Sequence, residues 1–169
     1  MSGLVVDASA ALTLLREEPG AEVVRHHLRD QIIAGEPILV PGLFWLEVVN
    51  VLALQYRYPP AAIVEAVYEL ERVGMTTAEV GRPGVLAVID AVGRSRLTAY
   101  EAAYLVLAES VGAPLLTADA QLASAAGDRA ILVGADPGVA EASAPYASGP
   151  SWADWKGAAV YLGELRAAL

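Results

Sequence analysis

The chain contains no cysteine, and lysine occurs only once among its 169 residues. Without cysteine, disulfides, thiolate catalysis and sulfur-ligated zinc sites are excluded, and a cytoplasmic setting is expected. The 11 basic residues are outnumbered by 20 acidic ones, so the formal net charge is −9. Because phosphate affinity normally comes from cations, such a chain suits nucleic acid only if bound metal masks some acids or its arginines are unevenly placed. Otherwise the acidic balance favours solubility or a basic protein partner.

Long hydrophobic runs and glycine-rich phosphate loops are also missing. No uncharged apolar stretch reaches the ~18 residues that would span a bilayer, and Met1–Asp7 lacks the basic start of a signal peptide. Neither G-x-G-x-x-G nor G-x-x-x-x-G-K-[ST] occurs. Ser9 has no evident histidine partner, which argues against a serine hydrolase. We therefore expect no membrane association and a chemistry that depends on other side chains.

Apolar residues are abundant, at 56% of the chain, and the mean hydropathy is +0.46. This composition predicts apolar surface beyond a core, such as a homodimer or partner interface. The length fits one domain, which we place at residues 1–135. Residues 137–151 are rich in Gly, Pro, Ser and Ala. We therefore expect residues 136–169 to form a linker-like segment and a C-terminal helix that packs on the domain or on a partner.

Short apolar runs alternate with segments of helical periodicity along the chain. Strands are expected at 4–6, 38–40, 75–80, 115–117 and 130–133. Helices are expected at 10–16, 21–34, 43–56, 60–72, 83–92 and 98–111. The alternation predicts an α/β fold of three layers, α/β/α, in which helices cover both faces of a central, mostly parallel sheet.

Two aspartates lie just after predicted buried strands. Asp7 follows the first strand, and Asp119 follows the strand at 115–117. Because ligands bind beyond the carboxyl ends of parallel strands, the two acids are candidates for one shared pocket. Each acid alone also fits the simpler role of a helix N-cap, which is common for Asp after a strand.

Two glutamates lie in predicted helices. Glu47 is surrounded by apolar residues, where a carboxylate is costly unless it is paired, metal-bound or facing solvent. Asn50 shares its helix face and could orient Glu47 or a metal-bound water, or be a surface amide. Glu101 follows Thr98 at the spacing of a capping box, and otherwise could point from its first helical turn into the pocket. Trp152, Trp155 and the tyrosines are interpreted as packing residues rather than as platforms for stacking bases.

Carboxylates held close together repel one another, and some would stay protonated near neutral pH. A bound Mg²⁺ or Mn²⁺ removes this cost, because hard cations prefer oxygen ligands. The metal can also lower the pKa of a bound water and stabilise charge on a phosphate. Such a cluster suits phosphodiester hydrolysis without a side-chain nucleophile.

Four segments, in this order and in these strand or helix contexts, resemble a known family. They are Val5–Ala10, Trp45–Leu52, Leu97–Leu105 and Leu115–Asp119. Over about residues 3–135 the chain resembles the PIN-domain family, especially the VapC-type ribonuclease toxins of bacterial toxin–antitoxin pairs. The resemblance implies a PIN-like fold, an RNA substrate, a homodimer and a cognate antitoxin that blocks the pocket.

The resemblance also assigns roles to individual residues. It implies a catalytic, metal-binding quartet that holds Mg²⁺ or Mn²⁺ and activates water: Asp7, Glu47, Glu101 and Asp119. It implies that the hydroxyls of Ser9 and Thr117 support the acids or the metal, and that Asn50 is a polar neighbour of the second acid.

The chain departs from the family pattern at two points. The third acid is usually Asp and here is Glu101, and Ala120 and Gln121 follow the fourth acid where some members carry another acid. Because octahedral Mg²⁺ tolerates displaced ligands poorly, a longer side chain could reduce activity. The alternative to a ribonuclease toxin is therefore a catalytically impaired PIN-like module that acts through protein or RNA binding.

A third hypothesis is a phosphoryl-transfer domain on another doubly wound sheet. The Asp7-Ala8-Ser9 segment lacks the second acid of an Asp-x-Asp phosphatase motif. A receiver domain needs a lysine after a late strand, and the only lysine is Lys156 in the C-terminal segment. The sequence therefore disfavours this class.

Overall fold

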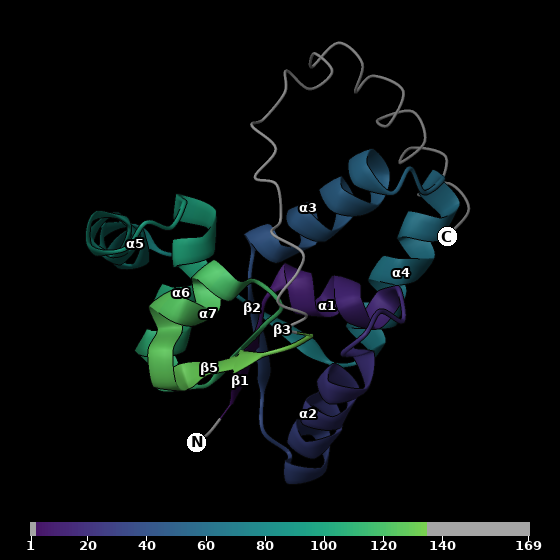
Figure 1. Ribbon diagram of the computed structural model, residues 1–169, viewed down its shortest axis with the longest axis horizontal. Coiled ribbons are helices and arrows are strands. Elements are labelled where there is room, and N and C mark those ends of the chain that lie inside the picture. The colour runs from purple at the N-terminus through teal and green to yellow at the C-terminus, as the bar shows by residue number, and fades with distance from the viewer. Residues whose placement is uncertain (1–2, 135–169) are drawn as a thin grey trace. The chain divides into compact units, whose positions relative to one another are not determined.

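A five-stranded parallel sheet forms the centre of the computed structural model, which describes residues 3–134 (Figure 1). The strand order is β3-β2-β1-β4-β5, and every neighbouring pair is parallel. The strands are β1 (Leu4–Val6), β2 (Ile38–Pro41), β3 (Met75–Ala78), β4 (Leu115–Thr117) and β5 (Ala130–Leu132). The predicted α/β class is thereby confirmed, with a sheet that is entirely parallel over the described residues.

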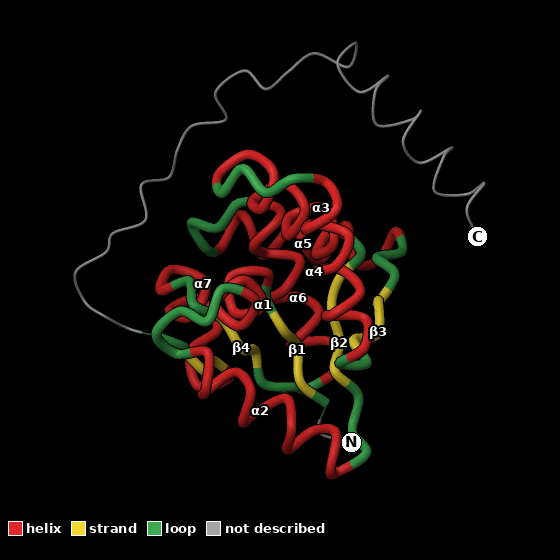
Figure 2. Tube along the Cα trace, turned by 90° about the vertical axis from the view of Figure 1, so that its right-hand side faces the viewer, coloured by secondary structure: helices red, strands yellow, loops and turns green. Residues whose placement is uncertain are grey.

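Seven α-helices flank the sheet in residues 3–134. They are α1 (Ala8–Leu15), α2 (Ala21–Ala34), α3 (Leu43–Asn50), α4 (Pro60–Arg72), α5 (Arg82–Arg94), α6 (Ala99–Val111) and α7 (Ala120–Ala126). In Figure 1, α5, α6 and α7 lie on one side of the strands, and α1, α2 and α4 lie on the other. Figure 2, turned by 90°, shows β4, β1, β2 and β3 side by side in that order. With helices on both sides of the strands in Figure 1, the predicted three layers are present.

The central strands are buried on both faces. Leu4, Val5 and Val6 of β1 and Leu115 and Leu116 of β4 are all buried, in line with their position in the middle of a helix-covered sheet. A strand covered on both faces needs no polar alternation, which is why unbroken apolar runs predicted these strands. The edge strand β3 has exposed threonines between its ends, so its sequence signal is weaker.

Several boundaries differ from those predicted. The helix expected at 43–56 is divided into α3 and a π-helical turn, η1 (Val51–Gln55). The short helix α7 and the 3-10 turn η2 (Gly127–Arg129) were not predicted, because seven mostly small residues carry little apolar periodicity. Gly35 ends α2 in the left-handed conformation that glycine favours, with φ of 67°.

The expected linker-like segment and C-terminal helix at 136–169 lie outside the described residues. Within residues 3–134, no helix is long and apolar enough to cross a membrane.

Candidate active site

The sheet changes its winding direction between β1 and β4. The chain continues from β1 to β2 and β3 on one side of β1, whereas β4 and β5 lie on the other side. Ligands of open α/β sheets bind beyond the carboxyl ends of the strands at such a reversal. Val6 pairs with Leu116, and the Asp7 amide donates to the Leu116 carbonyl at 2.9 Å. Asp7 and Thr117 therefore leave the sheet side by side at the expected position of a site.

Asp7 is buried, with 7% of its surface exposed. It occupies the N-cap position of α1, but its side chain makes no capping hydrogen bond, so the simple cap interpretation is wrong for this residue. Instead, its Oδ2 accepts hydrogen bonds from the hydroxyls of Ser9 and Thr117, the latter at 2.8 Å. Burial raises the pKa of Asp7 and the Asp119 charge adds to this, while the two hydroxyls act in the opposite direction.

The hydroxyls of Ser9 and Thr117 link the ends of β1 and β4. Ser9 Oγ accepts from the Ala118 amide at 2.9 Å, and Thr117 Oγ1 accepts from the Asp119 amide at 3.0 Å. The two hydroxyl oxygens are 3.2 Å apart. Each hydroxyl therefore joins the loop after β4 to Asp7, so the backbone of this loop orients the carboxylate through the two hydroxyls.

Asp119 differs from Asp7 because its side chain does cap a helix. Its Oδ1 accepts from the amides of Gln121 at 2.7 Å and Leu122 at 3.0 Å, at the start of α7. Asp119 is only partly buried. The cap interpretation thus holds for Asp119, and its charge still acts on Asp7.

Glu47 of α3 pairs with a residue that the sequence did not point to. The hydroxyl of Tyr104, which is 1% exposed on α6, donates to Glu47 Oε2. The pKa of Glu47 is raised from 4.5 to about 7, chiefly by burial and also by the charges of Asp7 and Glu101, against the lowering effect of the Tyr104 hydrogen bond. Tyr104 was interpreted as packing. Its place one turn after Glu101 was the available signal for a role in the site.

Glu101 forms the capping box that its spacing allowed. The Thr98 amide donates to Glu101 Oε2 at 2.6 Å, and the Glu101 amide donates to Thr98 Oγ1 at 3.2 Å. One Glu101 carboxylate oxygen is therefore engaged in a hydrogen bond at the start of α6. The charge of Glu101 still raises the pKa of Glu47. Asn50 lies on the same helix as Glu47 but is exposed.

Comparison with known proteins identifies the family. The sequence pattern of the PIN domain matches residues 4–128. The chain belongs to the PIN-domain family. This PIN domain is 33% identical over 124 residues to VapC ribonuclease Mb0985 of Mycobacterium bovis and to ribonuclease VapC9 of Mycobacterium tuberculosis. Each alignment covers 70% of this chain and 87% of the relative.

Solved structures agree with this PIN fold. PAE2754 from Pyrobaculum aerophilum has a TM-score of 0.58 and 26% identity, over 78% of this chain and 90% of that one. A chain of a toxin–antitoxin complex from Klebsiella pneumoniae has a TM-score of 0.53 and 14% identity, over 76% of this chain and 95% of that one. The predicted PIN-like architecture is confirmed.

The acids of this PIN domain are linked by charge but do not form a closed metal cage. Asp119 raises the pKa of Asp7, and both Asp7 and Glu101 raise the pKa of Glu47. Among residues 3–134, however, no three acidic or histidine side chains are arranged to hold one metal ion. The donor chemistry suits a hard cation, since every candidate ligand is a carboxylate oxygen. Capping bonds at Glu101 and Asp119 account for part of the open arrangement.

Proposed function

We propose that this PIN domain is a metal-dependent endoribonuclease and the toxin of a bacterial toxin–antitoxin pair. The observation that carries the proposal is Asp7, a buried carboxylate held by two hydroxyls at the winding reversal beside other acids. Within residues 3–134, no arginine or histidine forms an ion pair with any of the four acids. Uncompensated buried carboxylates favour a cation. The relatives that are ribonucleases support RNA as the substrate.

The residues divide into metal-holding and orienting groups. Asp7 and Glu47 supply carboxylate oxygens for Mg²⁺ or Mn²⁺, and Ser9, Thr117 and Tyr104 hold those carboxylates in place. The metal, when bound, activates water and stabilises charge on the phosphate.

The partly exposed acids complete the donor set. Glu101 and Asp119 would act as further ligands once released from their capping hydrogen bonds. Asn50, exposed one turn after Glu47, offers an amide to water or substrate.

The decisive experiment measures RNA cleavage with Mg²⁺, Mn²⁺ or EDTA. Asp7→Asn keeps an oxygen that can accept the Ser9 and Thr117 hydrogen bonds but loses the charge, so we expect cleavage to fall by about 100-fold or more. Asp128→Asn, an equivalent change at an exposed position of η2, should cleave like the wild type. Full activity of Asp7→Asn, or of the wild type in EDTA, would overturn the proposal.

The catalytically impaired module is the second candidate, and one observation favours it. Glu101 Oε2 is engaged by the Thr98 amide rather than directed at another acid. If this capping arrangement is permanent, metal binding is weak and the chain acts by binding alone. The wild type would then cleave no RNA in Mn²⁺, and Glu101→Asp alone would not create activity.

The proposal includes two protein partners. A homodimer uses α5, where Val85, Leu86, Ile89 and Val92 are exposed and Ala91 is the only buried residue. An antitoxin blocks the acidic site. The toxin–antitoxin complex with the same fold supports the second partner, and the apolar face of α5 supports the first.

A further inference from the structure

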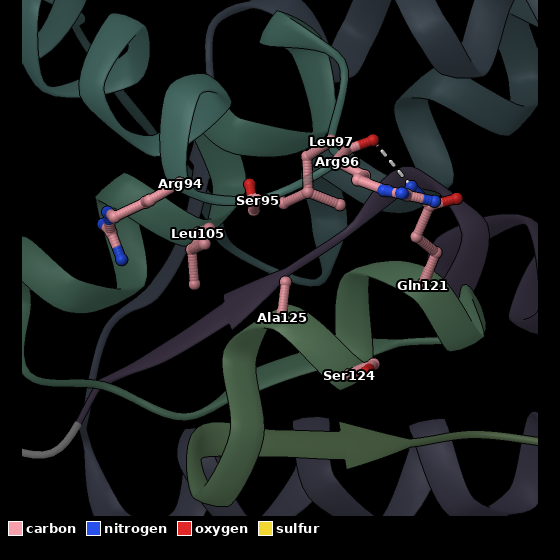
Figure 3. A pocket seen from close by; sticks show the side chains of 8 residues that line it. All are labelled: Arg94, Ser95, Arg96, Leu97, Leu105, Gln121, Ser124 and Ala125. Atoms are coloured by element: carbon pink, nitrogen blue, oxygen red, sulfur yellow. Dashed lines mark hydrogen bonds between the residues drawn. The ribbon is translucent and has the colours of Figure 1, made fainter.

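An open cavity of about 640 Å³ lies between α7 and the segment that joins α5 to α6 (Figure 3). Its polar lining consists of two guanidinium groups, two hydroxyls and one amide. They belong to Arg94, Arg96, Ser95, Ser124 and Gln121. In a chain of net charge −9, a cavity whose lining within residues 3–134 holds two arginines and no acid is chemically distinctive.

The two arginines of this cavity differ in what occupies their side chains. Arg94 is paired with Asp90 at 3.2 Å and with Glu109 at 2.8 Å. Arg96 is exposed and forms no ion pair with any residue in 3–134. Figure 3 shows Arg94 at one end of the cavity and Arg96 beside Gln121 at the other. Arg96 is therefore the guanidinium that can bind an external anion.

The backbone of Arg96 is tied to the acidic site. Gln121 donates its side-chain amide to the Arg96 carbonyl at 2.8 Å, and its backbone amide to Asp119 Oδ1 at 2.7 Å. Arg96 also lies two residues before Thr98, the capping partner of Glu101. These bonds involve the main chain of Arg96 and join it through Gln121 to Asp119, one of the four acids. Within residues 3–134 the Arg96 guanidinium forms no ion pair.

We infer that Arg96 binds a phosphate of the RNA strand flanking the cleaved bond, which makes this cavity a backbone subsite. The inference rests on the proposed ribonuclease function. An RNA strand that crosses the acidic site must place further phosphates beside it, where the carboxylates repel them. A guanidinium offset from the acids supplies the attraction, and its planar donors suit bidentate contact with phosphate oxygens.

The test measures RNA binding rather than cleavage. All proteins are the full chain with Asp7→Asn, so the labelled single-stranded RNA stays intact, and fluorescence anisotropy gives Kd over a series of KCl concentrations. The variants are Arg96→Gln, Arg96→Lys and, as a matched control, Arg29→Gln. Arg29 is exposed on α2 and, like Arg96, forms no ion pair within residues 3–134. Circular dichroism checks that each variant is folded.

We expect Arg96→Gln to weaken RNA binding by about five- to tenfold, as for an exposed charge-assisted contact. The slope of log K against log salt should become shallower by about 0.7, the change for one phosphate contact on a single strand. Arg96→Lys should keep the wild-type slope with intermediate affinity, because it retains the charge but loses the planar fork. Arg29→Gln should change neither quantity.

Three results would overturn the assignment. Equal effects of Arg96→Gln and Arg29→Gln would mean that RNA binding depends only on the net charge of the protein. Absence of measurable RNA binding would mean that there is no subsite. A glutamate-rich peptide whose binding requires Arg96, with RNA binding unaffected, would assign the cavity to an acidic protein. RNA cleavage by the wild type is measured separately. If the wild type cleaves no RNA but Arg96→Gln still weakens RNA binding, the nuclease proposal fails and the Arg96 subsite stands. If the wild type cleaves RNA but Arg96→Gln binds RNA normally, the subsite fails and the nuclease proposal stands.

Discussion

Asp7 and Asp119 both follow strands of the sheet, yet their side chains make different contacts. Asp119 caps α7, whereas the Asp7 side chain turns to the hydroxyls of Ser9 and Thr117 and leaves α1 uncapped. Thr117 is 110 residues from Asp7 in the chain. The sequence therefore predicted that these acids could share a site, but local spacing could not say which of them would be a cap.

Glu47 provides a residue-scale prediction about pH and stability. Its pKa is raised from 4.5 to about 7 in the folded chain, so between these values the folded state binds more protons than the unfolded state. The contribution of Glu47 therefore becomes more destabilising as pH rises through this window. Glu47→Gln has no such titration and can still accept the Tyr104 hydrogen bond.

Urea unfolding in EDTA should test this at pH 5 and pH 8, chosen on either side of the raised pKa of about 7. From pH 5 to pH 8, the free energy of unfolding of Glu47→Gln should rise relative to that of the wild type by on the order of 1 kcal/mol, after allowance for solvent screening. Exposed Glu79→Gln is the control and should show no such gain. Saturating Mn²⁺ should remove the advantage of Glu47→Gln if Glu47 is a ligand. A pH-independent difference would contradict the assignment.

At the scale of elements, the start of α6 combines a folding signal with a site residue. The pattern from Thr98 to Glu101 predicted a capping box as one of two roles, and the capping box is present. Helix periodicity did not separate α3 from the π-helical turn η1. A π turn differs from an α turn by one residue in its hydrogen bonding, which a pattern of apolar residues does not resolve.

Thr98→Ala should lower the free energy of unfolding by about 1 kcal/mol, because the Glu101 amide loses its side-chain acceptor. Thr98→Ser keeps a hydroxyl and should restore most of this. Thermal and urea unfolding of the three proteins provide the measurement. If α6 were stabilised only by its packing, Thr98→Ala and Thr98→Ser would unfold like the wild type.

At the scale of the whole molecule, the core of residues 3–134 leaves many large apolar side chains exposed. Helix α5 packs chiefly on α6 and turns an apolar face outward. In Figure 1 it lies outside α6, at the edge of this helical layer. The composition predicted such a surface, but only the packing identifies α5 as its location.

The proposed α5 homodimer predicts that Ile89→Glu shifts the chain to monomer, because a charge at the centre of the α5 face would be buried on association. Ile89 is 63% exposed, so the substitution should leave the fold intact. Ile33→Glu on α2, where the side chain is 77% exposed, is the matched control and should remain dimeric. Light scattering after size-exclusion chromatography gives the masses. A wild-type monomer, or equal behaviour of both variants, would contradict the α5 interface.

The sequence by itself determined the α/β class, the parallel sheet and the family, because buried strands, helical periodicity and the four segments of family resemblance are local patterns. It also marked the acids at the strand ends. Only the tertiary structure decided that Tyr104 contacts Glu47, that Thr117 holds the Asp7 carboxylate, and that Arg96 pairs with no acid among residues 3–134. These contacts join side chains from different elements, whose distances are set when strands and helices pack rather than by spacing along the chain.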